Sequence, residues 1–265
     1  MSRQIKLLIL GVITIALIII VSILRPIPQD AAFHHFADQT TFWGISNFAN
    51  VISNIPFLFV GFYGLALLQQ LKIYSRVRLM YMIIFIGIIL TGVGSAWYHI
   101  SPDNDRLVYD RIPMTIIFMT FLSITVFEWV SEKLGYILLF PLLILGIASV
   151  LWWHYTESIS QGDLRLYAFV QFYPMLITPI IFLLFHSKKK SQGLPLLIGV
   201  ILWYVVAKLA EKYDAPIYSF TGFISGHSIK HIAAAFATLY IVRFFKARYK
   251  HVTPHTIIPG DAITP

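Results

Sequence analysis

Long runs of apolar residues, separated by short polar segments, dominate the pattern along this chain. The hydrocarbon core of a bilayer is about 30 Å thick, so a helix that crosses it needs about 20 largely apolar residues. Lipid cannot satisfy backbone polar groups, whereas a helix satisfies them within its own segment. The pattern therefore predicts an all-α membrane protein with eight spans, at approximately Leu7 to Leu24, Trp43 to Leu68, Leu79 to Ile100, Ile112 to Val130, Tyr136 to Trp153, Leu166 to His186, Leu194 to Leu209, and Gly226 to Phe245.

The first apolar run begins with two basic residues, as a secretory signal peptide does. Its 18 residues exceed the roughly 7–15 apolar residues of a signal peptide, and Leu24-Arg25-Pro26 offers no small-residue cleavage site. We therefore expect an uncleaved helix. The chain then divides into an N-terminal transmembrane segment (1–30), a seven-span domain (31–250) and a proline-containing tail (251–265), which is predicted to be a disordered cytoplasmic end.

Lysine and arginine gather before the first run, between the second and third, between the sixth and seventh, and after the eighth. With eight spans these four segments lie on one side of the membrane, and the positive-inside bias makes that side cytoplasmic. Both termini are therefore predicted to be cytoplasmic. The opposite loops carry seven of the 12 acidic residues, Asp30, Asp38, Asp103, Asp105, Glu157, Asp163 and Asp214. Omitting any one span would destroy this agreement, which supports the count.

Composition changes this picture in two respects. The formal net charge of +8 has the sign that nucleic-acid binding requires, but the basic residues lie in short loops beside apolar runs, where membrane topology accounts for them. No nucleic-acid partner is therefore expected. Cysteine is absent, which excludes disulfides and thiolate ligands, so any metal must be held by nitrogen and oxygen atoms.

Five polar residues stand near the predicted outer ends of three apolar runs. His99 ends the third run, Asp110 precedes the fourth, His227 and His231 open the eighth, and Ser95 lies one helical turn from His99. Residues four apart share a helix face, so the two pairs can each point in one direction. Ionisable groups within a membrane are costly and usually functional. We expect one site, near the outer face.

Three histidines form the nitrogen donor set typical of catalytic zinc, which leaves a fourth position for water. Asp110 is then the candidate general base, and Ser95 the candidate hydrogen-bond donor to the developing oxyanion or to the water. A single interfacial histidine is more often a structural residue, and Ser95 beside Gly92 and Gly94 also suits helix packing. The full set predicts metal-assisted hydrolysis of a carbonyl compound that arrives from the bilayer.

The ordered set resembles the alkaline ceramidases and, more broadly, the CREST superfamily of seven-span metal hydrolases, which also includes the adiponectin receptor group and the GPI-anchor remodelling proteins. Its motifs are Ser-x-x-x-His, Asp at the start of the next span, and His-x-x-x-His in the last span. They match Ser95 and His99, Asp110, and His227 and His231. The segment Asn47-Phe-Ala-Asn-Val-Ile-Ser-Asn-Ile-Pro56 is similar to the first conserved span of alkaline ceramidases. The resemblance covers about residues 34 to 245 and implies a seven-helix CREST-like bundle with one added N-terminal helix.

The sequence departs from the family at a calcium site. Eukaryotic alkaline ceramidases have an Asp-Trp-x-Glu-x-Asn stretch before this span and a Glu at its start. Here Phe36-Ala-Asp-Gln-Thr-Thr-Phe-Trp43 precedes the span, and Asn47 stands in place of the Glu. Asp38 is the only carboxylate nearby, which disfavours calcium. Asp38 and Asn47 are kept as candidates for an accessory site.

The resemblance implies an intramembrane zinc-dependent hydrolase that cleaves the N-acyl amide bond of a ceramide-like membrane lipid to a fatty acid and a sphingoid-type base. Two alternatives are an adiponectin-receptor-like sensor with a structural zinc site, and a transporter that uses the same polar residues as an ion path. The short loops and the missing calcium acids favour a bacterial inner membrane. The sequence leaves open whether the bond is an amide or an ester, and which oligomer forms.

Overall fold

The computed structural model describes residues 1–186 and 193–250. The predicted disordered tail at 251–265 lies outside these residues. Within them, eight helical segments are long and apolar enough to cross a membrane, which confirms the predicted all-α membrane protein and its span count. The spans are α1 (Arg3–Ile23), α2 with α3 (Phe48–Ile52 and Ile55–Gln70), α4 (Ser75–Ile100), α5 with the π-helical turn η2 (Asn104–Thr125 and Val126–Val130), α6 (Glu132–Ser158), α7 (Arg165–Phe185), α8 (Leu194–Lys212) and α10 (Gly226–Tyr249).

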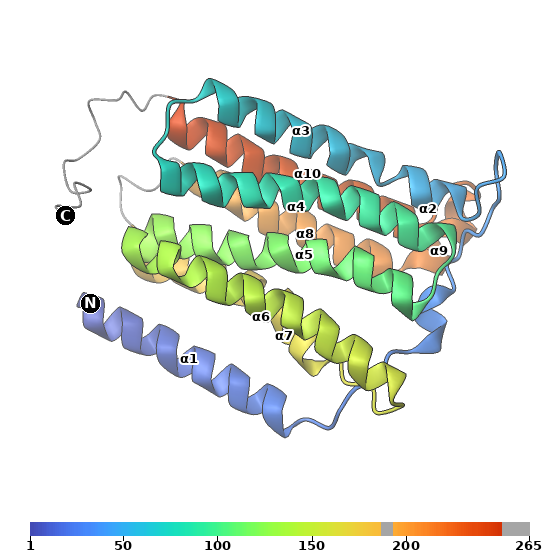
Figure 1. Ribbon diagram of the computed structural model, residues 1–265, viewed down its shortest axis with the longest axis horizontal. Coiled ribbons are helices and arrows are strands. Elements are labelled where there is room, and N and C mark those ends of the chain that lie inside the picture. The colour runs from blue at the N-terminus through green and yellow to red at the C-terminus, as the bar shows by residue number, and fades with distance from the viewer. Residues whose placement is uncertain (187–192, 251–265) are drawn as a thin grey trace.

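The helices run side by side, with α5 in the middle of the bundle and α1 and α3 at opposite edges (Figure 1). The span of α5 and η2 is the most deeply buried of the eight, and α4 and α10 follow it. Two short helices, η1 (Ala31–His34) and α9 (Asp214–Thr221), lie at the same end of the bundle as α2. The start of α1 and the end of α10 lie at the other end, as an even number of crossings requires.

Helix α5 begins eight residues earlier than the apolar run that predicted it. Asp103 caps its first turn by accepting a hydrogen bond from the Arg106 backbone N–H at 2.7 Å. The polar residues that follow Asp103 obscured this start, because they read as a loop. As a result Asp110 lies in the second turn of the helix rather than at its start, and its side chain is buried.

Helix α1 has no buried residue, and its apolar side chains are exposed along its length, as a lipid-facing helix requires. It rests against α7, where the hydroxyls of Thr14 and Tyr173 are 2.7 Å apart and the Lys6 ammonium lies over the Phe185 ring. This helix therefore adds an edge to the bundle, where Leu10 and Ile13 pack, partly buried, against the main hydrophobic core.

Candidate metal centre

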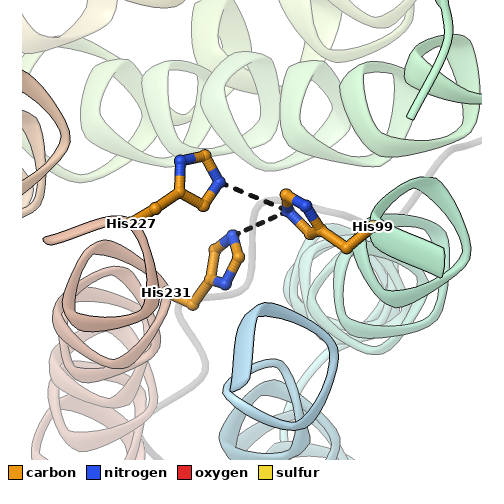
Figure 2. A group of neighbouring side chains, drawn as sticks. All are labelled: His99, His227 and His231. Carbon is orange, nitrogen blue, oxygen red and sulfur yellow. Dashed lines mark hydrogen bonds between the residues drawn. The ribbon is translucent and has the colours of Figure 1, made fainter. Parts of the chain in front are cut away.

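Three imidazoles meet at the end of the bundle where α4 stops and α10 begins. His99 comes from the last turn of α4, and His227 and His231 come from the first two turns of α10. Figure 2 shows the three rings turned toward one another. The Nε2 atom of His99 is 3.1 Å from Nε2 of His231 and 3.3 Å from Nε2 of His227. All three side chains are buried, and they form the one such group of three that the described residues contain.

These distances fit a metal with three histidine ligands. Zinc–nitrogen bonds of about 2.0–2.1 Å at tetrahedral angles put neighbouring ligand nitrogens about 3.3–3.4 Å apart. The ligand atoms of the cluster all lie within 4.8 Å of one another, so small ring adjustments bring the third pair into the same range. The predicted set of His99, His227 and His231 is thus brought together and is able to hold a metal ion.

The hydrogen bonds of His231 fix which of its nitrogens faces the cluster. Its Nδ1 atom is 2.8 Å from the hydroxyl of Ser53, and that hydroxyl donates its own hydrogen to the backbone carbonyl of Asn50 at 3.0 Å. Ser53 therefore accepts a hydrogen bond from Nδ1–H, which leaves the Nε2 lone pair free for a metal. The break between α2 and α3 at Ser53 and Asn54 is what turns this hydroxyl toward α10.

Aromatic packing holds the other two rings. The ring of Phe36 lies 4.7 Å from that of His99 and 4.5 Å from that of His227, measured between centroids, and the ring of Tyr98 lies 4.8 Å from that of His99. The Nδ1 atom of His99 finds no hydrogen-bond partner among the described residues. His99 is thus positioned by its helix and by ring contacts, and His231 by a hydrogen-bond relay.

The start of α10 is fixed by two side chains and one close backbone contact. Ser225 caps the helix by accepting from the Ser228 N–H, and the carboxylate of Asp214 accepts from the His227 N–H at 2.7 Å. A Cβ atom on Gly226 would stand 2.2 Å from the carbonyl oxygen of Ala210, so only glycine allows α10 to approach α8 here. These contacts fix the position of His227 along the axis of α10 and relative to α8.

Ser95 and Asp110 meet across the contact between α4 and α5. A Cβ atom on Gly94 would stand 2.0 Å from the carbonyl oxygen of Tyr109, so the missing side chain lets the two backbones touch. This contact brings Ser95 and Asp110, the residues that follow Gly94 and Tyr109, next to each other. Both residues line a cavity of about 110 Å³, and His231 lines it too. The structure thus places all five predicted residues at one end of the bundle.

The two accessory candidates are engaged within the protein. Asp38 accepts from the Thr40 N–H at 2.9 Å, and Asn47, in a left-handed backbone conformation, donates to the carbonyl oxygen of His99 at 2.9 Å. Among the described residues, neither belongs to a group of three acidic or histidine side chains close enough to share a cation. Their observed contacts tie the segment before α2 to the end of α4.

Two charged residues also belong to the site, and one of them, Lys230, did not emerge from the sequence. Lys230 lies between His227 and His231, with its ammonium 2.9 Å from a carboxylate oxygen of Glu211 and 3.2 Å from Nε2 of His227. Glu211 also pairs with Lys208 on its own helix. The only sequence signal for Lys230 was a lysine inside the His-x-x-x-His motif, and its partner on α8 depends on tertiary packing.

Comparison with known proteins agrees with the geometry. Residues 37–254 match the family model described as Ceramidase. A Dictyostelium discoideum protein that bears the provisional name alkaline ceramidase dcd3A is 27% identical over 231 residues, which cover 69% of this chain and 77% of the relative. The matched region leaves out α1 and includes every residue of the candidate site except Phe36, which packs on it.

Proposed function

Because the chain belongs to the ceramidase family, we propose that it is an intramembrane, zinc-dependent amidohydrolase that cleaves the N-acyl bond of ceramide-like lipids. The products are a fatty acid and a sphingoid-type base. The observation that carries the proposal is a cluster of three buried imidazoles, one of which, His231, lines an apolar cavity together with Ser95 and Asp110. The family match favours this activity over the sensor and transporter alternatives.

His99, His227 and His231 are the residues that would hold the zinc ion, through their Nε2 atoms. When bound there, zinc supplies a Lewis acid and makes a water nucleophile accessible at neutral pH. Asp110 takes a proton from the attacking water and returns it to the amide nitrogen as the carbon–nitrogen bond breaks. Ser95, beside Asp110, hydrogen-bonds the attacking water or the oxygen that gains negative charge. Ser53 and Phe36 keep the imidazoles in place.

The cavity supports a lipid substrate. Below its polar end the walls are apolar, with Phe57, Met114, Phe118, Val200 and Ile241 among the lining residues, a surface that suits an acyl chain. A groove between α7 and α8 shares Met175, Tyr204, Lys208 and Glu211 with this cavity. We propose that lipid enters laterally through this groove, next to the helix that contains Pro174 and Pro179.

The test is a mass-spectrometric assay of purified, zinc-loaded protein with ceramides and with extracted membrane lipids. Equal amounts of fatty acid and amino base should appear. His99→Ala should lose both bound zinc, measured by elemental analysis, and hydrolysis. His154→Ala is the matched control, because His154 lies at the same end of the bundle but pairs with Asp105. Full zinc occupancy with no hydrolysis of any N-acyl lipid, or unchanged zinc in His99→Ala, would refute the proposal.

We further propose that both termini are cytoplasmic and that the metal centre lies near the outer face of a bacterial inner membrane. The alternation of basic and acidic loops supports this orientation. The chain has no cysteine, so a single introduced thiol reports its own location. In intact cells an impermeant maleimide should label Gln161→Cys, in the exposed loop after α6, and should label Ser2→Cys only after lysis. The reverse labelling would overturn the orientation.

A further inference from the structure

Three charged side chains lie at the polar end of the cavity and have no part in the chemistry described so far. Lys208, Glu211 and Lys230 all line it. Glu211 already has an ammonium partner in Lys208, three residues before it on α8. Lys230, from α10, is a second cation on the same carboxylate, at 2.9 Å. The trio therefore has one positive charge that no carboxylate within it balances.

Lys230 is the member of the trio nearest the imidazoles. Its side chain is only 17% exposed, and its ammonium is 3.2 Å from Nε2 of His227. Placing a lysine between two histidines in this position is costly unless its charge is used, since a buried ammonium loses hydration. A structural ion pair with Glu211 does not explain the second contact. That contact puts the charge beside the atoms that would hold the metal.

The hydrogen-bond capacity of Lys230 exceeds what Glu211 uses. An ammonium has three N–H donors, and the carboxylate accepts one of them. The donor that meets His227 in this structure is released once the Nε2 lone pair of His227 binds a metal. At least one N–H of a cation that Glu211 fixes would then be free for a group bound in the cavity that Lys230 lines.

We propose that Lys230 is a catalytic residue that donates a hydrogen bond to the carbonyl oxygen of the scissile amide, and that Glu211 is the positioning residue that aims it. This inference rests on the proposed function. As the water oxygen bonds to the carbonyl carbon, one water proton moves to Asp110 and the carbonyl π pair moves onto oxygen. The Lys230 ammonium meets that oxyanion and keeps its own protons. The pair then returns, the carbon–nitrogen bond breaks, and the nitrogen takes the proton from Asp110, which yields one carboxylic acid and one amine.

A preorganised cation at this position acts mainly on the transition state, because the charge that it stabilises is small in the bound amide and nearly full in the oxyanion. Removing one such donor lowers kcat by roughly 10²–10³-fold. The same contact should hold the carboxylate of the fatty acid product, whose oxygen occupies the place of the amide oxygen.

The experiment compares wild type, Lys230→Met, Lys230→Arg and Lys246→Met, all zinc-loaded. Lys246 is the matched control because it lies on α10 about 24 Å further along the helix axis, where its ammonium is 3.2 Å from the Tyr63 hydroxyl. Three quantities are measured: bound zinc, kcat per bound zinc with a ceramide, and the dissociation constant of a fluorescent fatty acid. Lys230→Met should keep its zinc, lose roughly 10²–10³-fold in kcat, and bind the fatty acid at least about tenfold more weakly.

Lys230→Arg, which keeps the charge, should retain more of kcat than Lys230→Met, and Lys246→Met should match wild type in all three quantities. The role of Lys230 is overturned if Lys230→Met equals wild type in kcat per bound zinc. It is also overturned if the variant loses zinc while the molecules that keep zinc work at the wild-type rate, since Lys230 would then be structural. An inactive, zinc-loaded wild type would instead refute the proposed function, and this inference with it.

Discussion

Replacing Gly94 by alanine tests whether the close contact of α4 and α5 sets the geometry of the site. The new Cβ atom would stand 2.0 Å from the carbonyl oxygen of Tyr109 and 2.8 Å from its carbonyl carbon, whereas ordinary contact begins at 3.4 Å. The obstructing atoms are backbone, so they cannot rotate away. The helices must separate by about 1.4 Å at this level, and the Ser95 hydroxyl must move from the Asp110 carboxyl with them.

Two magnitudes follow from this separation. Overpacking of this kind costs about 1–3 kcal/mol of folding free energy. A misplacement of about 1 Å in a catalytic constellation costs on the order of 10²-fold in rate. We therefore expect Gly94→Ala to lower the melting temperature in detergent moderately, to reduce kcat/KM for ceramide on the order of 10²-fold, and to keep its zinc, since His99, His227 and His231 need not move apart.

Gly87→Ala is the matched control, because Gly87 lies about two turns earlier on the same face of α4. A Cβ there would meet side-chain atoms of Ile116 and Ile117 at 3.1 and 3.3 Å, and these can shift by a few tenths of an ångström. It should cost much less activity than Gly94→Ala. If Gly94→Ala retained wild-type melting and wild-type kcat/KM, the idea that this contact positions Ser95 against Asp110 would be wrong.

Two more predictions concern the metal and pH. Ser53→Ala removes the hydrogen-bond partner of His231 Nδ1 and should weaken zinc binding by about 10–100-fold, measured by competition titration with a chelator. Ser22→Ala, on α1, is the control and should bind zinc as tightly as wild type. Equal zinc affinities in the two variants would contradict the role of Ser53 in orienting His231. The hydrogen bonds from Arg165 hold the pKa of Asp163 below its usual value. This ion pair stabilises the fold at pH values above the pKa of Asp163 in the unfolded chain, about 3.9, and the stabilisation is lost as the pH falls through the lower pKa of the folded state. The difference in melting temperature between wild type and Asp163→Asn should therefore persist from pH 7 to 5 and shrink below pH 4. A difference that grew on acidification would contradict this sign.

The span count, the helical fold and the family resemblance followed from the sequence because each depends on local patterns. Apolar runs longer than a bilayer is thick have few alternatives to helices. The i, i+4 spacing of His227 and His231 places two rings on one face whatever surrounds them. The resemblance to ceramidases is confirmed by the family match. The roles of Ser95 and Asp110 stay predictions.

Other features of the site depend on packing between distant segments, which spacing does not reveal. The relay from Ser53 to His231 requires a break between α2 and α3. The ion pair of Lys230 and Glu211 requires α8 and α10 to be neighbours. Helix α9 has only eight residues, too few to form an apolar span, and so the apolar pattern did not reveal it. The first two turns of α5 were not predicted either, because they contain charged and polar residues, and an N-cap aspartate resembles a loop residue when only the sequence is known.

The ligand set joins parts of the chain that are far apart, since His227 follows His99 by 128 positions. A metal ion bound in this cluster would therefore fasten the end of α4 to the start of α10, and it would bind the folded chain far better than the unfolded one. By mass action, each tenfold rise in free metal concentration above the dissociation constant increases the free energy of unfolding by about 1.4 kcal/mol. The concentration of available metal would then determine the lifetime of the folded protein in its membrane as well as its catalytic rate.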